Sequence, residues 1–117
     1  MPVRSLNSPV LKWPESTKVE AAFREWAVRL ADTMPDILRI GYFGSCARND
    51  WGVGSDLDIL VIVKKSDEPF HVRSMHYDTS DLPVPSDILV YTEEEWNGLD
   101  PNSKFFKTIS KEIVWVE

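Results

Sequence analysis

Seven residues near the middle of the chain, Leu57 to Val63, form an almost continuous apolar run that only Asp58 interrupts. The length of this run and its content of branched aliphatic residues are typical of a strand that is buried on both faces. Such a strand needs other strands at its edges and further elements against its faces. The run therefore predicts the central strand of a small mixed β-sheet with flanking helices, an α/β (α+β) fold.

Shorter patterns predict the remaining elements. Thr17 to Glu20 has the spacing of a capping box, and the apolar residues that follow recur at helical intervals until Pro35 ends the helix. Thr92 to Glu95 has a second capping-box spacing and opens a short helix that stops near Gly98. The other expected elements are a strand at 37–43, a helical turn at 46–50, a short helix near 70–76, a strand at 87–91, a helix from 102 or 103 to about 111 and a strand at 113–116.

Length and composition indicate one globular domain. The 117 residues suffice for one ordinary domain and are too few for two. Hydrophobic residues make up 43% and charged residues 27%, which is close to the globular average. Residues 1–16 are rich in proline and show little periodicity, so we interpret them as an N-terminal arm. The domain itself is expected at 17–117.

Charge and cysteine content restrict the compartment and the partners. Cys46 is the single cysteine, which excludes an intramolecular disulfide and favours a reducing compartment. The N-terminal residues lack the apolar core of a signal peptide, and no apolar run has the length of a membrane helix. We therefore expect a cytoplasmic protein without membrane contact. A net charge of −6 argues against a grip on long nucleic acid, although a local site can still bind a nucleotide.

Two aspartates at the start of the central strand carry the main chemical signal. Asp56 and Asp58 are two residues apart, and side chains alternate along a strand, so both carboxylates point to one face. Two carboxylates on one face repel each other and lose solvation when the strand is central. A divalent cation relieves both costs, and carboxylate oxygens suit Mg²⁺. Taken alone, the two residues could equally be solubilising charges at a strand entrance.

A phosphate-binding turn is expected shortly before these aspartates. Gly44 and Ser45 follow the strand at 37–43, where free backbone N–H groups can cradle an anion and glycine lets phosphate approach closely. The Ser45 hydroxyl adds a donor. Arg48 lies one turn further on, where it could pair with a phosphate or remain a solvated surface residue. A phosphate cradle beside a carboxylate–metal site is the basic equipment for phosphoryl or nucleotidyl transfer.

Asp87 is the candidate third carboxylate. It begins the strand at 87–91, the same relative place that Asp56 and Asp58 have in theirs. If the two strands pair, Asp87 reaches the shared pocket, where it could hold a second metal ion and help to deprotonate an attacking hydroxyl. Capping of the turn after Pro85 and Ser86 is the alternative interpretation.

Together these residues resemble a known family. Gly44-Ser45, followed after ten residues by Asp56-x-Asp58, resembles the pattern of the nucleotidyltransferase superfamily of DNA polymerase beta. The segments at 44–48, at 55–58 and around Asp87 look like those of its minimal nucleotidyltransferases, and the likeness spans roughly residues 17–117. Asn49 stands where the family commonly has glycine, and asparagine tolerates positive φ better than most residues.

The resemblance implies a nucleotidyltransferase fold and a Mg²⁺-dependent reaction. A nucleoside monophosphate, above all AMP, would pass from a triphosphate to a hydroxyl on a protein or small molecule, with release of pyrophosphate. Two Mg²⁺ ions would be held by Asp56, Asp58 and Asp87. The residues implied to contact the nucleotide are Gly44, Ser45, Arg48 and Ser55.

The family also suggests a second function. Some of its members act as antitoxins, so the chain could be a binding module that neutralises a separate HEPN-type helical partner, with or without adenylylating it. An intact set of three aspartates favours the enzyme, because a pure binding module needs no clustered carboxylates. A homo-oligomer is compatible with either function.

Several residues near the motifs have simpler interpretations. Ser55 alone could cap the turn before the central strand. Trp51 is open to packing or to stacking on a base. Cys46, His71 and His76 are better explained as a small residue and two solvated side chains than as a reactive thiol and a metal pair.

Overall fold

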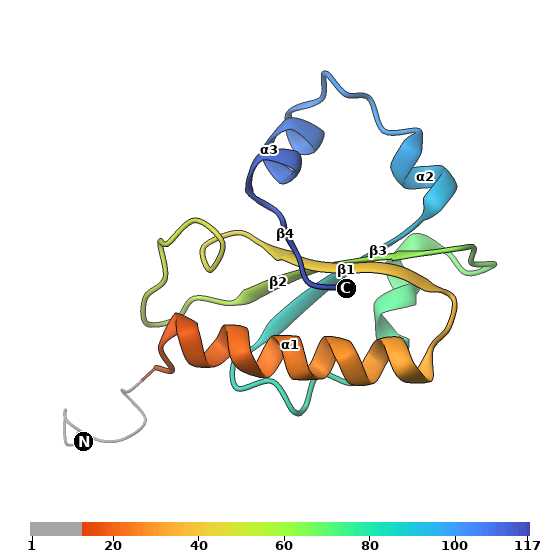
Figure 1. The fold of residues 1–117 in the computed structure, drawn as a ribbon. Helices are drawn as coiled ribbons and strands as arrows, with labels where there is room; N and C mark the ends of the chain where they lie inside the picture. The colour runs from red at the N-terminus through yellow and green to blue at the C-terminus, as the bar shows by residue number, and fades with distance from the viewer. Residues whose placement is uncertain (1–12) are drawn as a thin grey trace.

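The computed structural model describes residues 13–117, so residues 1–12 of the predicted arm lie outside it. Within the described residues, a four-stranded sheet lies between α1 on one side and α2 with α3 on the other (Figure 1). No helix in this part of the chain is both long and apolar enough to cross a lipid bilayer. In chain order the elements are α1 (Ser16–Thr33), β1 (Ile37–Phe43), β2 (Leu57–Val63), the 3₁₀ helix η2 (Phe70–His76), β3 (Ser86–Thr92), α2 (Glu93–Asn97), α3 (Lys104–Glu112) and β4 (Val114–Trp115).

The sheet is mixed, and its order is β3-β2-β1-β4. The apolar run Leu57–Val63 forms β2, which lies at the centre, antiparallel to β1 and parallel to β3. The short strand β4 closes the other edge, antiparallel to β1. The predicted fold class and the predicted central strand are confirmed.

The larger core lies between α1 and one face of the sheet. Phe23 of α1 is fully buried, stacks on Trp26 and meets the ring of Tyr42 edge to face. The Trp26 indole donates a hydrogen bond of 2.8 Å to the carbonyl of Asp78, which ties the segment before β3 to the helix. Other buried members of this core are Val19, Ala27, Ile40, Leu57, Ile59, Val61 and Val90. Removal of these side chains from water is the main force that holds α1 on the sheet.

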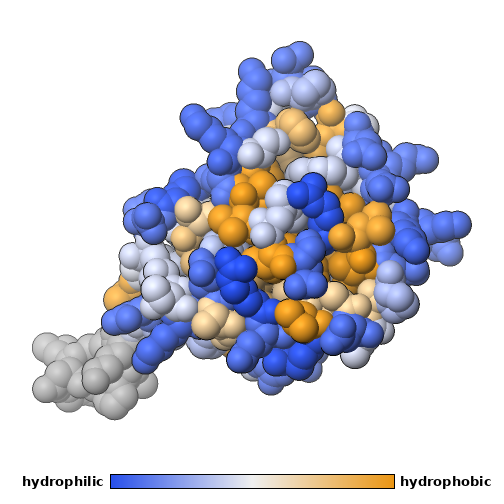
Figure 2. All heavy atoms as spheres, in the orientation of Figure 1, coloured by the Kyte–Doolittle hydropathy of each residue, from blue (hydrophilic) through white to orange (hydrophobic). Residues whose placement is uncertain are grey.

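Aromatic side chains build a smaller layer on the other face. Tyr91 of β3 contacts Phe70, Trp96 and Phe105, and Trp96 also contacts Trp115 of β4. On the surface, Figure 2 shows apolar residues gathered in the middle of the view, with hydrophilic residues around them. The sheet is thus covered on both faces, which explains why β2 tolerates so few polar residues.

The predicted capping box at the start of α1 is wrong. The helix begins at Ser16, the N-cap is Glu15, and no side chain caps the helix there. Thr17 therefore lies inside the helix, and the N–H groups of Lys18 and Val19 donate to the carbonyl of Glu15. The Glu20 carboxylate accepts a hydrogen bond from the Tyr42 hydroxyl of β1 and lies 3.6 Å from Arg24. By contrast, the capping box of Thr92 and Glu95 is confirmed at the start of α2.

The loop between β1 and β2 begins with a single α-turn at 44–48, which lies two residues before the predicted helical turn at 46–50 and does not extend into a helix. The N–H of Arg48 donates to the carbonyl of Gly44 at 3.0 Å, and the N–H of Asp50 donates to the carbonyl of Ser45 at 2.9 Å. Asn49 adopts a φ of 62°, a left-handed conformation that an α-helix excludes and asparagine tolerates. The turn therefore curls back on itself instead of continuing as a helix.

Two tryptophans fasten the rest of this loop to the residues before α1. The Trp13 indole donates to the carbonyl of Ser55 at 3.2 Å, and the Trp51 indole donates to the carbonyl of Pro14 at 2.8 Å. Trp51 also packs against the core. The two reciprocal bonds hold the loop in place at the point where it enters β2.

Candidate active site

The strand register brings two of the predicted aspartates together. Asp58 of β2 and Asp87 of β3 are direct neighbours in the parallel ladder, so their side chains leave the same face of the sheet. Asp58 is also the register partner of Phe43 at the end of β1, and both line a cavity beside α3. Asp56 is exposed at the entrance of β2, two residues before Asp58.

Burial and the neighbouring carboxylates together make Asp58 a weaker acid than a free aspartate. Its side chain is half-buried, and this burial raises the pKa of the carboxyl, with further contributions from the charges of Asp87 and Asp56. Arg48 acts in the opposite direction and is outweighed. The ionised Asp58 carboxylate therefore costs the fold stability, and a cation bound beside it would offset that cost.

The three aspartates have the right chemistry for a divalent cation, although their carboxylates do not converge on a common point in this conformation. Among residues 13–117, no three Asp, Glu, His or Cys side chains converge closely enough to hold a metal ion. Asp56 and Asp87 are exposed, so each carboxylate is free to turn toward Asp58. Three oxygen-donor side chains at the starts of two neighbouring parallel strands, with mutual repulsion to relieve, match the preferences of Mg²⁺.

The turn after β1 binds the carboxylate of Glu112, a residue of α3. The N–H of Gly44 donates to Oε1 of Glu112 at 3.0 Å, and Nη1 of Arg48 lies 3.4 Å from both carboxylate oxygens of the same residue. We call these two donors, the Gly44 N–H and the Arg48 guanidinium, the anion seat. A carboxylate side chain held there shows that the turn has the geometry to bind a negatively charged oxygen.

Gly44 is required where the anion seat meets the aspartates. Its φ is +82°, and an added Cβ would lie 2.2 Å from Oδ2 of Asp58. Any side chain at this position would therefore push the Asp58 carboxylate away from its place. The anion seat and the carboxylates are thus adjacent parts of one site.

A matched pair of glycines tests this contact. Gly54 has nearly the same φ, +86°, but an added Cβ there meets nothing within 4 Å. Alanine at either position should cost about 1 kcal/mol of unfolding free energy, because both adopt the left-handed conformation. Only Gly44→Ala should displace Asp58, so only this variant should bind Mg²⁺ with a triphosphate at least tenfold more weakly. Urea unfolding and calorimetric titration measure the two effects, and equal affinities in both variants would separate Asp58 from the ligand.

Two cavities share Asp58 and Phe43 in their walls. One has a volume of about 440 Å³ and includes Gly44, Arg48 and Glu112, with Lys104 and Thr108 of α3 on its wall. The other has a volume of about 570 Å³ and extends past Asp87. Its wall carries the hydroxyl-bearing residues Ser74, Tyr77, Thr79 and Ser86. Asp58 therefore lines both the cavity that contains the anion seat and the cavity with hydrogen-bonding groups on its wall.

The other residues singled out in the sequence have the following surroundings. Ser45 is half-buried within the turn. The Ser55 hydroxyl accepts a hydrogen bond of 3.0 Å from the N–H of Gly52, which is the geometry of a turn cap. Burial raises the pKa of the Cys46 thiol, which disfavours the reactive thiolate. The exposed His76 pairs with Glu68.

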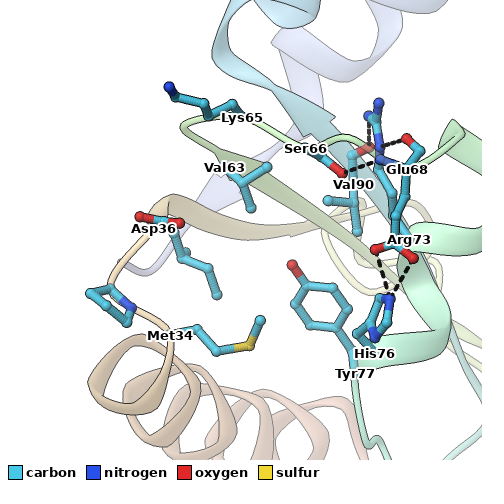
Figure 3. Close-up of a pocket in the computed structure, with 12 residues that line it drawn as sticks. Met34, Asp36, Val63, Lys65, Ser66, Glu68, Arg73, His76, Tyr77 and Val90 are labelled. Carbon is cyan, nitrogen blue, oxygen red and sulfur yellow. Dashed lines mark hydrogen bonds and ion pairs between the residues drawn. The ribbon is translucent and has the colours of Figure 1, made fainter.

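A further cavity of about 360 Å³ lies at the far end of the sheet, where β2 ends at Val63 (Figure 3). Apolar side chains such as Met34 line it, and the Tyr77 ring points into it. Arg73 at its edge is occupied by hydrogen bonds to the carbonyls of Glu68 and Val90. The predicted aspartates begin their strands at the opposite end, so this cavity is separate from the candidate site.

Sequence patterns did not indicate Glu112, Lys104 or Thr108. All three come from α3 and reach the site because the chain after β3 folds back over the sheet. One local signal was present for Glu112. It is the last residue of a helix, where the negative end of the helix dipole disfavours an acidic side chain.

Comparison with known proteins gives the family. The family described as nucleotidyltransferase domain matches residues 24–115. A candidate nucleotidyltransferase from Sulfolobus solfataricus has the same fold, with a TM-score of 0.59 and 21% identity over 89% of this chain and 87% of its own. A toxin–antitoxin solved with AMP-PNP gives a TM-score of 0.57 and 15% identity over 80% of this chain and 72% of the other. No curated protein matches in sequence. Because the family match extends from α1 to β4, the chain belongs to the nucleotidyltransferase domain family.

Proposed function

We propose that this protein transfers a nucleoside monophosphate, AMP in the first place, from a Mg²⁺-bound triphosphate to a hydroxyl on a protein or small molecule. The observation that carries the proposal is the position of Asp58. This residue is the neighbour of Asp87 in the sheet, and its carboxylate lies so close to Gly44 of the anion seat that no side chain would fit between them. Carboxylates for a metal and donors for phosphate are the two parts that nucleotidyl transfer needs.

The chemistry of each candidate residue suggests its role in the transfer. Gly44, Ser45 and Arg48 would bind the phosphates through the backbone N–H, the hydroxyl and the guanidinium. Asp56, Asp58 and Asp87 would hold Mg²⁺, two ions by analogy with the family. Mg²⁺ bound there would offset the negative charge of the phosphates and make the acceptor hydroxyl more acidic. Ser55 would act indirectly, because its hydroxyl already caps the loop.

The two cavities beside Asp58 suggest where each reactant lies. The triphosphate would enter the hollow with Arg48 and Lys104, and the acceptor hydroxyl would approach from the hollow beside Asp87. The hydroxyl oxygen would form a bond to the α-phosphorus while the bond to the β-phosphate oxygen breaks. Asp87 would accept the hydroxyl proton, and pyrophosphate would leave on the Arg48 side. In-line displacement requires the attacking and leaving oxygens to lie on opposite sides of the phosphorus, and two separate cavities would let the acceptor and the pyrophosphate occupy different places.

A second function is suggested by one fold relative. The toxin–antitoxin solved with AMP-PNP shares the fold of this chain, so a role as an antitoxin that binds or adenylylates a HEPN-type helical protein is the alternative. The AMP-PNP in that structure is also the reason to test ATP first. Three carboxylates at the starts of two neighbouring strands favour catalysis over binding alone, because their repulsion has no use in a passive module.

Label transfer from ATP tests the proposal. The protein is incubated with Mg²⁺, a candidate acceptor and ATP labelled at the α-phosphate, in parallel with ATP labelled at the γ-phosphate. We expect Mg²⁺-dependent transfer of the α-label to the acceptor and none of the γ-label, because the nucleotide moves and pyrophosphate leaves. Transfer of the γ-label would indicate a kinase. Tight binding of a helical partner without label from either ATP would favour the antitoxin.

A further inference from the structure

Glu112 occupies the anion seat with a nearly buried carboxylate. Only 13% of its side chain is exposed, against 47% for Arg48. Its Oε1 accepts the Gly44 N–H at 3.0 Å and lies 3.4 Å from Nη1 of Arg48. The donors that the proposed function assigns to a phosphate are therefore already bound to a carboxylate of the same chain.

Local helix physics does not explain a glutamate at this position. Glu112 ends α3, where the helix dipole disfavours a negative charge, and it lies in the same cavity as Asp58. Its charge also adds to the forces that raise the pKa of Asp58. The helix dipole and the charge of Asp58 both disfavour the Glu112 carboxylate. Its attraction to the Gly44 N–H and the Arg48 guanidinium offsets these two costs.

We propose that Glu112 is an internal competitor for the anion seat, whose carboxylate must leave before a triphosphate or pyrophosphate can bind. This inference rests on the proposed function, because it assumes that the phosphates use Gly44 and Arg48. Two anions cannot accept the same N–H, and a phosphate beside a fixed carboxylate would be repelled. The carboxylate returns once the phosphate departs, so Glu112 weakens binding of the substrate and helps to expel pyrophosphate.

The exchange needs only a rotation of the Glu112 side chain. The backbone on either side is held, because the N–H of Ile113 donates to the carbonyl of Ile109 at 2.9 Å and β4 then pairs with β1 at Gly41 and Tyr42. The cavity beside Glu112, about 440 Å³, leaves space for the displaced side chain. A fixed backbone with a movable carboxylate is the arrangement expected for reversible competition.

Glu112→Gln separates this competition from a structural role. Glutamine keeps an oxygen that can accept the Gly44 N–H but loses the charge that attracts Arg48 and repels phosphate. The matched control is Glu25→Gln, which removes the same charge from an exposed residue of α1. Calorimetric titration with pyrophosphate and with Mg²⁺–α,β-methylene-ATP, a triphosphate that cannot be cleaved at the α-position, should show both ligands binding Glu112→Gln about tenfold more tightly than wild type. That factor corresponds to one charge-assisted hydrogen bond. Glu25→Gln should bind like wild type.

The other outcomes are distinct. Wild-type binding with equal or weaker binding by Glu112→Gln overturns the competition and leaves the proposed function standing. Absence of binding in all three proteins overturns the phosphate site itself.

An NMR measurement on the wild type tests the same proposal without any variant, so a variant that folds poorly cannot affect it. The amide proton of Gly44 should change its NMR shift when pyrophosphate is added, because it exchanges a carboxylate for a phosphate acceptor, and an unchanged Gly44 signal at saturating pyrophosphate contradicts the proposal.

Discussion

Replacement of Asp58 or Asp87 by asparagine is expected to abolish nucleotide transfer and to leave the metal-free fold at least as stable as wild type. The folded-state pKa of Asp58 is raised above its ordinary value of 3.8, chiefly by burial and then by Asp87 and Asp56. A raised carboxyl pKa means that the folded state loses stability as the pH climbs through that range, so the ionised group is a net cost at neutral pH. Asparagine removes this cost together with a metal ligand.

Melting curves with and without Mg²⁺–ATP measure both halves of this prediction. At ten times its Kd, the ligand should stabilise the wild type by about 1.4 kcal/mol, or about 5 °C in melting temperature for a domain of this size. Asp58→Asn and Asp87→Asn should melt no lower than wild type without ligand and show no shift with it. Asp67→Asn, at an exposed position in the loop after β2, is the control that should keep the shift. An Asp87→Asn protein that unfolds readily but still responds to Mg²⁺–ATP would identify Asp87 as a turn cap.

The largest loss of stability is expected from Glu95→Gln, far from the candidate active site. Arg73 is buried, with 7% of its side chain exposed, and its guanidinium meets Glu95 at 2.6 Å and 3.0 Å. Removal of the partner charge leaves a buried cation without its counter-ion, which should cost about 2–3 kcal/mol, at or below the low end for buried pairs because Glu95 is 40% exposed. Glutamine can still accept the N–H of Thr92, so the helix cap is preserved.

Chemical unfolding of Glu95→Gln and of Glu94→Gln compares two charges in the same helical turn, of which Glu95 pairs with Arg73 and Glu94 makes no ion pair within residues 13–117. Glu94 is exposed, so its replacement should change the unfolding free energy by less than about 0.5 kcal/mol. Similar losses in both variants would show that the Arg73–Glu95 pair contributes little.

Acid unfolding offers an independent check of the same pair. Hydrogen bonds from Arg73 and then from Thr92 lower the pKa of Glu95 from 4.5 to about 2. A lowered carboxyl pKa gives stability that is fully present above the unfolded value and lost as the pH falls through the folded one. The wild type should therefore lose stability between about pH 4.5 and 2, and Glu95→Gln should lack this part of the loss. The slope is opposite in sign to that expected for Asp58.

The sequence by itself determined those features that depend on neighbours along the chain. The almost continuous apolar run at 57–63 predicted a strand covered on both faces, and it forms β2. Thr92 and Glu95 made their capping box because both members lie within one turn and nothing else competed for Thr92. Asp56 and Asp58 were recognisable as a pair because strand geometry places residues two apart on one face.

Only the tertiary structure decided which distant residues meet. Glu20 had capping-box spacing with Thr17, but α1 begins one residue before Thr17, and the Glu20 carboxylate accepts a hydrogen bond from the Tyr42 hydroxyl of β1 instead. Asp87 became the neighbour of Asp58 through the parallel pairing of β2 and β3. The bond from Gly44 to Glu112 joins residues 68 positions apart. The energies of such contacts depend on where the folded chain places the two groups, so no local pattern encodes them, and the residue that fills the anion seat was visible only after the sheet and α3 had come together.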